Sequence, residues 1–408
     1  MEQPRRPCLR ADRAAGMTRA HDPYHLDDLD LDHLRRRRGI KWSRPDPAVL
    51  PAWVADMDFL PPPAVRAALE GLLDRGDLGY PNWDGGSPLA PVFAQRMQQV
   101  HGWPAEREHV RTFTDLVQIV QVVLHLATRP GDGVALHVPN YPPFLETLHH
   151  MRRRALPSPI TRSAAGWRFD AARLARDISE QGCRVLLLVN PHNPTGRVLT
   201  HDELAAIAEI VVDHDLLVIA DEIHADLTYP GHTHVPFASL SAQVAARTVT
   251  ATSATKAFNL AGIRCAVAHV GAPDLRARLE AQPPDLYGAV SVPGVEATLA
   301  AWSHGEEWLD AVRARLHRNR DRLARLVATH LPGVRFDPPE GSYLAWLDFR
   351  PLGLPEEPDD FFRAHAGVEL SPGHTFGPGG RGFARLNFAT SGDILTEIVT
   401  RMGAAVAP

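Results

Sequence analysis

The chain has few cysteines, few lysines and no long apolar run. Its 408 residues include three cysteines, Cys8, Cys183 and Cys265, which lie far apart in the sequence. Three scattered thiols exclude a disulfide framework and a thiolate metal cluster, so we expect free cysteines in a reducing compartment. No uninterrupted apolar stretch approaches the roughly 20 residues that a membrane-spanning helix needs. The sequence therefore indicates a protein without a membrane span.

Positive charge is not in excess either. The formal net charge is −5, with 43 Lys and Arg residues against 48 Asp and Glu residues. This balance provides no overall basic field for binding nucleic acid. Residues 1–20 are rich in Arg and Pro and lack the apolar core of a secretory signal, and Met17 is an alternative start to Met1. We therefore expect a cytoplasmic protein that binds neither nucleic acid nor a membrane.

Lysine is nearly absent. Lys41 and Lys256 are the two lysines among the 43 basic residues, and the others are arginines. Chemistry that needs a primary side-chain amine thus has two candidates. Lys256 lies among small, hydroxyl and apolar residues, where partial burial would lower the pKa of its ammonium group. A lysine of this kind suits covalent binding of an aldehyde, although a surface lysine is the simpler interpretation of this residue alone.

Strand-like and helix-like segments alternate between about residues 110 and 290. Short apolar runs predict strands at 134–138, 185–189, 216–220 and 248–252. The apolar segments 117–126 and 204–212 predict helices. Continuous apolar strands such as 185–189 are typical of sheets covered on both faces. The alternation therefore predicts an α/β layer with a mainly parallel sheet.

The character of the chain changes near residues 60 and 300. We predict four parts: a flexible tail at 1–22, the N-terminal part of a small domain at 23–60, a large domain at 61–300, and the C-terminal part of the small domain at 301–408. Prolines at 61–63 predict the start of a helix. Further along, the pattern predicts a helix at 308–327, followed by the segment YLAWL at 343–347 and a Gly/Pro-rich loop at 371–382, which together indicate a smaller α+β domain.

Polar segments follow three of the predicted strands. The strand at 185–189 is followed by NPHNPTG at 190–196, and the strand at 216–220 is followed by DEIH at 221–224. The strand at 248–252 is followed by SATKAFNLAGIR at 253–264. In open α/β sheets, ligands bind beyond the carboxyl ends of the strands. We therefore expect the ligand site among these three segments.

Asp221 and Lys256 together indicate which cofactor the site could bind. A buried carboxylate can keep a pyridine nitrogen protonated and a lysine can bind an aldehyde, which is the protein half of pyridoxal-phosphate chemistry. The sequence contains neither a Gly-x-Gly-x-x-Gly motif after a strand nor a serine nucleophile elbow. His232 and His234 form a pair that no carboxylate or cysteine set accompanies, so we expect no metal site.

Seven motifs, spread over about residues 23–400, carry a family resemblance. They are WVADMDF at 53–59, GYPNW at 79–83, NPHNPTG at 190–196, DEIH at 221–224, SATKAFNLAG at 253–262, YLAWLDFR at 343–350 and GFARLN at 382–387. The chain resembles fold-type I pyridoxal-phosphate enzymes of the class I/II aminotransferase superfamily. Within it, the chain is most similar to the branch of cystathionine β-lyases and cysteine-S-conjugate β-lyases. The resemblance implies pyridoxal 5′-phosphate as cofactor and an aspartate-aminotransferase fold, in which helices enclose a mainly parallel seven-stranded sheet and a smaller α+β domain is attached.

The resemblance also implies roles for residues around the cofactor ring. Lys256 would bind the cofactor aldehyde covalently and later move protons. Asp221 would pair with the pyridinium nitrogen, and Asn193 would hydrogen-bond the phenolic oxygen. Tyr141 would stack on the ring, an arrangement that aromatic side chains favour. His224 stands where aspartate aminotransferases have a tyrosine, but it matches the lyase branch.

A second group of residues resembles the family's phosphate site. Asp115, Leu116 and Val117 match the phosphate cup, at the start of a helix whose free amides suit an anion. Ser253 would add a hydroxyl group, and Arg264 has the spacing of the phosphate arginine of aminotransferases. Asp115 stands where small or polar residues are usual, so we expect its backbone amide or its capping role to matter. Several β-lyases carry an uncharged residue in place of Arg264.

The remaining implied contacts concern the substrate and a second subunit. Arg385 would clamp the substrate α-carboxylate with its planar guanidinium group, next to Asn193. Tyr80 resembles the tyrosine that reaches the phosphate from the partner subunit and that lies near the substrate. The resemblance thus implies a homodimer with its sites at the subunit interface.

The activity that this resemblance implies is a β-elimination. A small amino-acid thioether, cystathionine or another cysteine S-conjugate, would yield a thiol, pyruvate and ammonia. One alternative keeps the cofactor and makes the protein an aminotransferase, or a decarboxylating or oxidative deaminase of a specialised cysteine conjugate; Arg264 favours it. A second alternative is a regulatory protein that binds a partner on this fold. The identity of the substrate beyond Cβ stays open.

Overall fold

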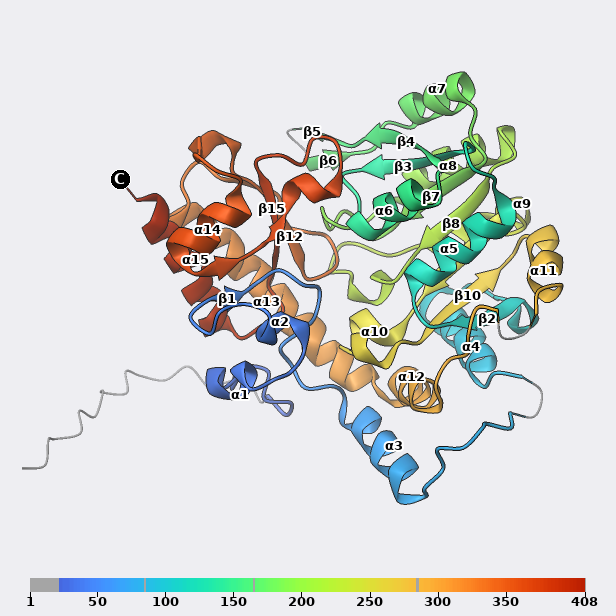
Figure 1. The fold of residues 1–408 in the computed structure, drawn as a ribbon, viewed down its shortest axis with the longest axis horizontal. Helices are drawn as coiled ribbons and strands as arrows, with labels where there is room; N and C mark the ends of the chain where they lie inside the picture. The colour runs from blue at the N-terminus through green and yellow to red at the C-terminus, as the bar shows by residue number, and fades with distance from the viewer. Residues whose placement is uncertain (1–21, 84–85, 164–165, 284–285, 408) are drawn as a thin grey trace, which may run out of the picture.

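The computed structural model describes residues 22–83, 86–163, 166–283 and 286–407 (Figure 1). The predicted tail, including Cys8 and both candidate start residues, lies outside the described residues apart from Asp22. None of the described helices combines the length and apolar character needed to cross a membrane.

A seven-stranded sheet forms the centre of the larger part of the molecule. The strands follow the order β2 (Val110–Phe113), β10 (Ala266–Val270), β9 (Thr248–Thr252), β8 (Leu217–Asp221), β7 (Val185–Val189), β3 (Gly133–Val138) and β4 (Arg154–Pro159). β10 runs antiparallel to both of its neighbours, and the remaining adjacent pairs are parallel. The predicted mainly parallel seven-stranded sheet is therefore confirmed.

Helices cover both faces of this sheet because successive side chains of a strand point to opposite sides. In β7, Leu187 joins one apolar cluster, whereas Leu186 and Leu188 join another. The first cluster packs under α5 (Leu116–Ala127), α6 (Pro142–His150) and α11 (Pro273–Glu280). The second packs under α7 (Ala171–Gln181), α8 (His201–Asp213) and α9 (Ala242–Ala245). This double cover explains why the strand sequence is apolar at every position.

Three further helices pack together beside the sheet. α12 (Val292–His304) lies against both α3 (Pro63–Asp74) and α4 (Leu89–His101). α3 begins at the third proline of the predicted 61–63 start. The 25-residue helix α13 (Glu306–His330) follows, and Trp308, Leu316 and Val327 lie on its buried side. The predicted amphipathic helix is confirmed.

A second, smaller sheet lies in the C-terminal part of the molecule, drawn in orange and red in Figure 1. Its antiparallel order is β11 (Arg335–Phe336), β12 (Leu344–Asp348), β15 (Phe383–Asn387) and β14 (Ser371–Pro372). α14 (Pro358–Ala366) and α15 (Gly392–Val406) pack on each other beside it. The early elements α1 (Leu31–Arg35), α2 (Ile40–Ser43) and β1 (Leu50–Pro51) precede α3 in the chain. β1 pairs with β13 (Val368–Glu369), which supports the predicted assignment of 23–60 and 301–408 to one domain; the boundaries stay a prediction.

The structure differs from the expected elements in several places. β8 begins one residue later than expected and ends on Asp221, which is therefore part of the strand. The expected loop at 371–382 contains the short strand β14, which exists through its pairing with β15. The antiparallel pairing of β5 (Thr161–Ser163) with β6 (Gly166–Arg168) was not expected. Such two- and three-residue strands are defined by pairing partners, which an apolar pattern does not reveal.

Candidate active site

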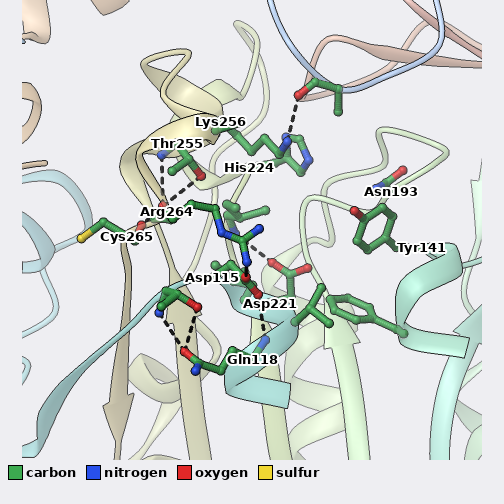
Figure 2. Close-up of a pocket in the computed structure, with 18 of the residues that line it drawn as sticks. Asp115, Gln118, Tyr141, Asn193, Asp221, His224, Thr255, Lys256, Arg264 and Cys265 are labelled. Atoms are coloured by element: carbon green, nitrogen blue, oxygen red, sulfur yellow. Dashed lines mark hydrogen bonds and ion pairs between the residues drawn. The ribbon is translucent and has the colours of Figure 1, made fainter. Parts of the chain in front are cut away.

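A cavity of about 610 Å³ opens at the carboxyl ends of the central strands (Figure 2). Ten of the predicted site residues line it: Asp115, Leu116, Val117, Tyr141, Asn193, Asp221, His224, Ser253, Lys256 and Arg264. Arg385 is linked to the cavity through Asn193, whereas Tyr80 is fully exposed and does not line it. The structure thus gathers residues that are up to 149 positions apart, such as Asp115 and Arg264, around one space.

Lys256 lies on α10 (Ala254–Ala257), a single turn that begins directly after β9. The Ser253 side chain caps this turn by accepting a hydrogen bond from the Thr255 amide at 3.1 Å. The Lys256 Nζ atom donates to the Ala55 carbonyl at 2.8 Å. Burial lowers the pKa of Lys256, and the neighbouring Asp56 partly opposes this shift. A larger fraction of this amine is therefore neutral than for an exposed lysine.

Asp221 ends β8, in the middle of the sheet, and its side chain is buried. Burial raises its pKa to about 7, because a low-dielectric environment disfavours the charged carboxylate. Its Oδ1 atom accepts a hydrogen bond from the Ile223 amide at 3.1 Å, which favours the charged form in part. A cationic N–H group next to this carboxylate would compensate for the cost of its burial.

Arg385, on β15, connects the smaller sheet to the cavity. Its Nη1 atom donates to the Asn193 Oδ1 atom at 3.0 Å, and its Nη2 atom donates to the Trp53 carbonyl at 3.0 Å and the Ser371 hydroxyl at 3.1 Å. Burial lowers its pKa to about 10, so the group still carries a positive charge at neutral pH. The buried Nε atom has no hydrogen-bond partner among the described residues, which leaves a donor for an anion.

Asp115 and Arg264 occupy the other end of the cavity and form an ion pair. Asp115 is the N-cap of α5: its Oδ1 atom accepts from the Gln118 amide at 2.8 Å. The Arg264 side chain is 63% exposed. The helix start, with Leu116 and Val117 in its first turn, leaves amides free to point at an anion.

Two rings complete the lining. The His224 side chain is buried, and burial lowers its pKa to about 3, so the imidazole is neutral at physiological pH. Its ring lies edge-on to Tyr343, with centroids 5.9 Å apart. Tyr141 directly precedes α6 and meets Phe144 edge-on, with centroids 5.3 Å apart. Burial raises the pKa of Tyr141, which keeps its hydroxyl protonated.

Sequence reasoning missed several groups that touch the predicted residues. The Ala55 carbonyl accepts from Lys256 and also from the Tyr343 hydroxyl at 2.9 Å. Ser371 donates to the Trp53 carbonyl. Ala55, Trp53 and Tyr343 belong to motifs that carried the family resemblance. Membership of these motifs was the one feature of the sequence that could have pointed to them. A backbone carbonyl cannot be identified as a functional group from residue type.

Several histidines outside the cavity lie close to carboxylates. His234 contacts Glu222 at 3.1 Å, whereas His232 lies 3.7 Å from a different carboxylate, so the predicted histidine pair is split between two partners. Sequence reasoning missed the group of Glu106, His109 and His269, whose potential ligand atoms lie within 4.8 Å of one another. A hydrogen bond of 3.1 Å between His269 and Glu106 already satisfies the facing atoms of these two side chains.

Comparisons with known proteins identify the family of the chain. Residues 54–402 match the family model of aminotransferase class I and II. A cystathionine beta-lyase of Bacillus subtilis is 33% identical over 93% of this chain and 100% of its own length. An arginine–pyruvate transaminase of Pseudomonas aeruginosa is 30% identical over 87% of this chain and 89% of its own length. The structure of the PLP-bound C-S lyase from Staphylococcus hominis superimposes with a TM-score of 0.86, at 27% identity over 93% of this chain and 99% of that one. The chain therefore belongs to the aminotransferase class I and II family.

Proposed function

We propose that the protein is a pyridoxal-phosphate-dependent carbon–sulfur β-lyase that acts on cystathionine or another cysteine S-conjugate. The observation that carries this proposal is that Lys256, Asp221 and Asn193 line one cavity, to which Arg385 is linked through its hydrogen bond to Asn193. The similarity to the cystathionine beta-lyase and the C-S lyase named above supports the choice of reaction.

The residues of the cavity fit the cofactor chemically. Asp221 is a buried carboxylate whose pKa is raised mainly by burial and is only partly lowered by the Lys256 cation, and a pyridinium N–H would stabilise its charged form. Lys256 provides an amine with a lowered pKa. The first turn of α5 and Arg264 provide amides and positive charge for a phosphate group. Asn193 lies between these groups and Arg385, with an amide that can bind the ring oxygen.

Each residue then has a defined task in the reaction. Pyridoxal phosphate, when bound, supplies an aldehyde for the substrate amine and a ring that withdraws electrons from Cα. Asp221 keeps a proton on the ring nitrogen. Lys256, with its lowered pKa, accepts the Cα proton as a general base. Arg385 binds the substrate carboxylate and thereby orients the Cα–H bond toward Lys256. Tyr141 lines the same cavity and would pack against the ring.

The bonds balance as an elimination. The Cα–H bond and the Cβ–S bond break, a carbon–carbon double bond forms, and the sulfur leaves with the electron pair of its former bond. The thiolate takes up a proton from solvent. Water then converts the remaining enamine to pyruvate and ammonia, so no oxidant or reductant is needed.

Product analysis tests the proposal. The protein with pyridoxal phosphate is incubated with cystathionine and with an S-alkyl cysteine, and we expect equal amounts of thiol and pyruvate. The Lys256→Ala variant serves as the control for release that does not depend on the enzyme. Exchange of the amino group with a keto acid, without release of thiol, would overturn the proposal.

Aminotransfer is the second candidate function, and a specific residue favours it. Arg264 has the spacing of the phosphate arginine of aminotransferases, and a transaminase is among the relatives at 30% identity. In that reaction Lys256 would still remove the Cα proton, but no bond to Cβ would break. The product analysis above separates the two reactions directly.

We further propose that two copies of the chain form the functional unit. Tyr80 is fully exposed, and the exposed leucines Leu73 and Leu78 lie close to it in the sequence. Tyr80 would reach the phosphate site of a partner subunit. An active protein that remains monomeric in sedimentation experiments at assay concentration would contradict this. The cytoplasmic location stays a prediction.

A further inference from the structure

A short segment close to the cavity holds two of the proposed functional groups by its backbone. We call residues 53–59 the strap. The Lys256 Nζ atom donates to the Ala55 carbonyl at 2.8 Å, and the Arg385 Nη2 atom donates to the Trp53 carbonyl at 3.0 Å. The position of the strap therefore sets where the amine and the guanidinium group rest.

Side chains from several parts of the chain fix the strap. The Asn387 Nδ2 atom donates to the carbonyls of Val54 and Asp56, both at 2.7 Å. The Asn259 Nδ2 atom donates to the Met57 carbonyl at 3.0 Å, and its Oδ1 atom accepts from the Met57 amide at 2.9 Å. The strap has no regular secondary structure, and side-chain hydrogen bonds to its backbone carbonyls fix it instead.

Lys41, the second lysine of the chain, also contacts the strap. Its side chain is 4% exposed, and its Nζ atom donates to the Asp56 carbonyl at 3.0 Å. The same atom lies 2.9 Å from the Asp58 Oδ1 atom, on a side chain that is 1% exposed. The Trp42 Nε1 atom donates to this carboxylate at 2.7 Å. The two lysines therefore hold adjacent carbonyls, those of Ala55 and Asp56.

The hydrogen bond from Lys41 to the backbone carbonyl of Asp56 is not needed to neutralise the Lys41 ammonium group. A buried ammonium group is costly unless a carboxylate pairs with it, and Asp58 provides that partner for Lys41. The additional hydrogen bond fixes the peptide unit next to the one that holds Lys256. Lys41 is not among the residues that line the cavity, so it acts on the site through the strap.

We infer that Lys41 is a positioning residue: by holding the Asp56 carbonyl it places the strap so that Ala55 and Trp53 hold Lys256 and Arg385. This inference rests on the proposed function for its catalytic consequence, but not for the geometry itself. Two variants separate the contact from the ion pair. Asp58→Asn breaks the ion pair and keeps the Lys41 donor, whereas Lys41→Met combined with Asp58→Asn removes both without leaving a lone buried carboxylate.

The first measurement uses the cofactor-free protein. Its side-chain amines are Lys41 and Lys256, so acylation with acetic anhydride, followed by peptide mass spectrometry, reports on each of them. At high pH, where the amine is neutral, the labelling rate of Lys256 depends on its accessibility. We expect K41M/D58N to raise this limiting rate about threefold or more, and D58N to leave it close to that of the native protein, because a displaced strap no longer shields the amine. Equal rates in both variants would overturn the inference.

The second measurement uses the holoenzyme and a cysteine thioether. We expect kcat/KM to fall about tenfold in K41M/D58N and by less than about threefold in D58N, since small displacements of positioned groups are costly. An equal fall in both variants would assign Lys41 a structural role through its ion pair. Should the native protein release no thiol, the proposed function fails while the labelling result still decides the inference.

Folding is controlled by comparing thermal unfolding of the native protein and both variants. If K41M/D58N lacks a cooperative transition, Lys41→Gln in the Asp58→Asn background replaces it. Glutamine keeps the site polar but is one atom shorter than lysine, so it cannot maintain the Asp56 contact in the native strap. We expect that variant to show the same rise in Lys256 labelling; labelling equal to that of D58N would contradict the inference.

Discussion

The two ends of the cavity control charge in different ways. At the sheet end, burial sets the state of Asp221, whose pKa rises to about 7, and that of His224, whose pKa falls to about 3. At the α5 end, Arg264 is 63% exposed and its charge is met by Asp115 in an ion pair. The buried end has a fixed environment before any ligand binds, whereas solvent screens the exposed end.

This difference predicts where substitutions matter. A buried group has few alternative partners, so its loss leaves an uncompensated change in the site. An exposed ion pair contributes little, typically about 0–1 kcal/mol, because water and salt replace either partner. Substitutions at the sheet end should therefore change activity strongly, and substitutions at the α5 end weakly.

Asp221→Asn should have the largest effect. An amide of the same shape cannot hold a ring nitrogen in its protonated state, so we expect kcat to fall about 100-fold or more. Turnover of a cysteine thioether at saturating pyridoxal phosphate measures this. A fall below tenfold would mean that the buried carboxylate does not control the reaction.

Arg385→Lys should come next. Lysine keeps the charge but cannot maintain the three contacts to Asn193, Trp53 and Ser371 together with a bidentate contact to a carboxylate. We expect KM for the thioether to rise about tenfold or more, with a smaller change in kcat. The matched control is a thioether amine without the carboxylate, for which native and variant enzymes should differ little. A similar loss for both substrates would contradict a carboxylate clamp.

The pH dependence of stability should show a moderate effect of Asp221. Its folded-state pKa lies above the ordinary value of 3.8, so the folded state binds the proton more tightly than the unfolded state. The resulting stabilisation is complete below about pH 4 and is lost as the pH rises to about 7. Urea unfolding of the cofactor-free protein at pH 5 and 7.5 measures this loss. Asp221→Asn should reduce it; an unchanged loss would show that Asp221 is not its source.

Asp115→Asn should have the smallest effect. Asparagine keeps an acceptor for the Gln118 amide, so the cap of α5 persists while the negative charge beside Arg264 disappears. We expect pyridoxal phosphate to bind up to about threefold more tightly, and less so at high salt, because an exposed charge is screened. Equilibrium titration at two ionic strengths measures the change. Weaker binding by tenfold would show that the Asp115 charge itself supports the site.

Much of the fold could be predicted because its signals are local. β7 is apolar at every position since helices cover both of its faces, and α13 repeats its apolar residues at helical spacing. The polar segments after β7, β8 and β9 could be placed together because parallel strands end at the same edge of a sheet. Lys256 stood out through the scarcity of lysine.

The rest depends on contacts between distant segments. The Ala55 carbonyl and Lys256 are 201 residues apart, and Trp53 and Arg385 are 332 apart, so no local pattern links them. β14 is a strand through its pairing with β15. Tyr80 could be matched to a family motif, but it is fully exposed in the single chain. Its proposed contact, the phosphate site, belongs to a second subunit and cannot be read from one chain.

The central claim is that Lys256 is the amine that binds the cofactor, and the scarcity of lysine makes it directly testable. Borohydride reduction of the holoenzyme would fix a bound aldehyde to its amine as a stable secondary amine. Peptide mapping then distinguishes the two lysines. We predict one pyridoxyl group, on Lys256, and loss of the borohydride-sensitive visible band in Lys256→Ala. Modification of Lys41, or a protein that forms no covalent adduct, would contradict the account.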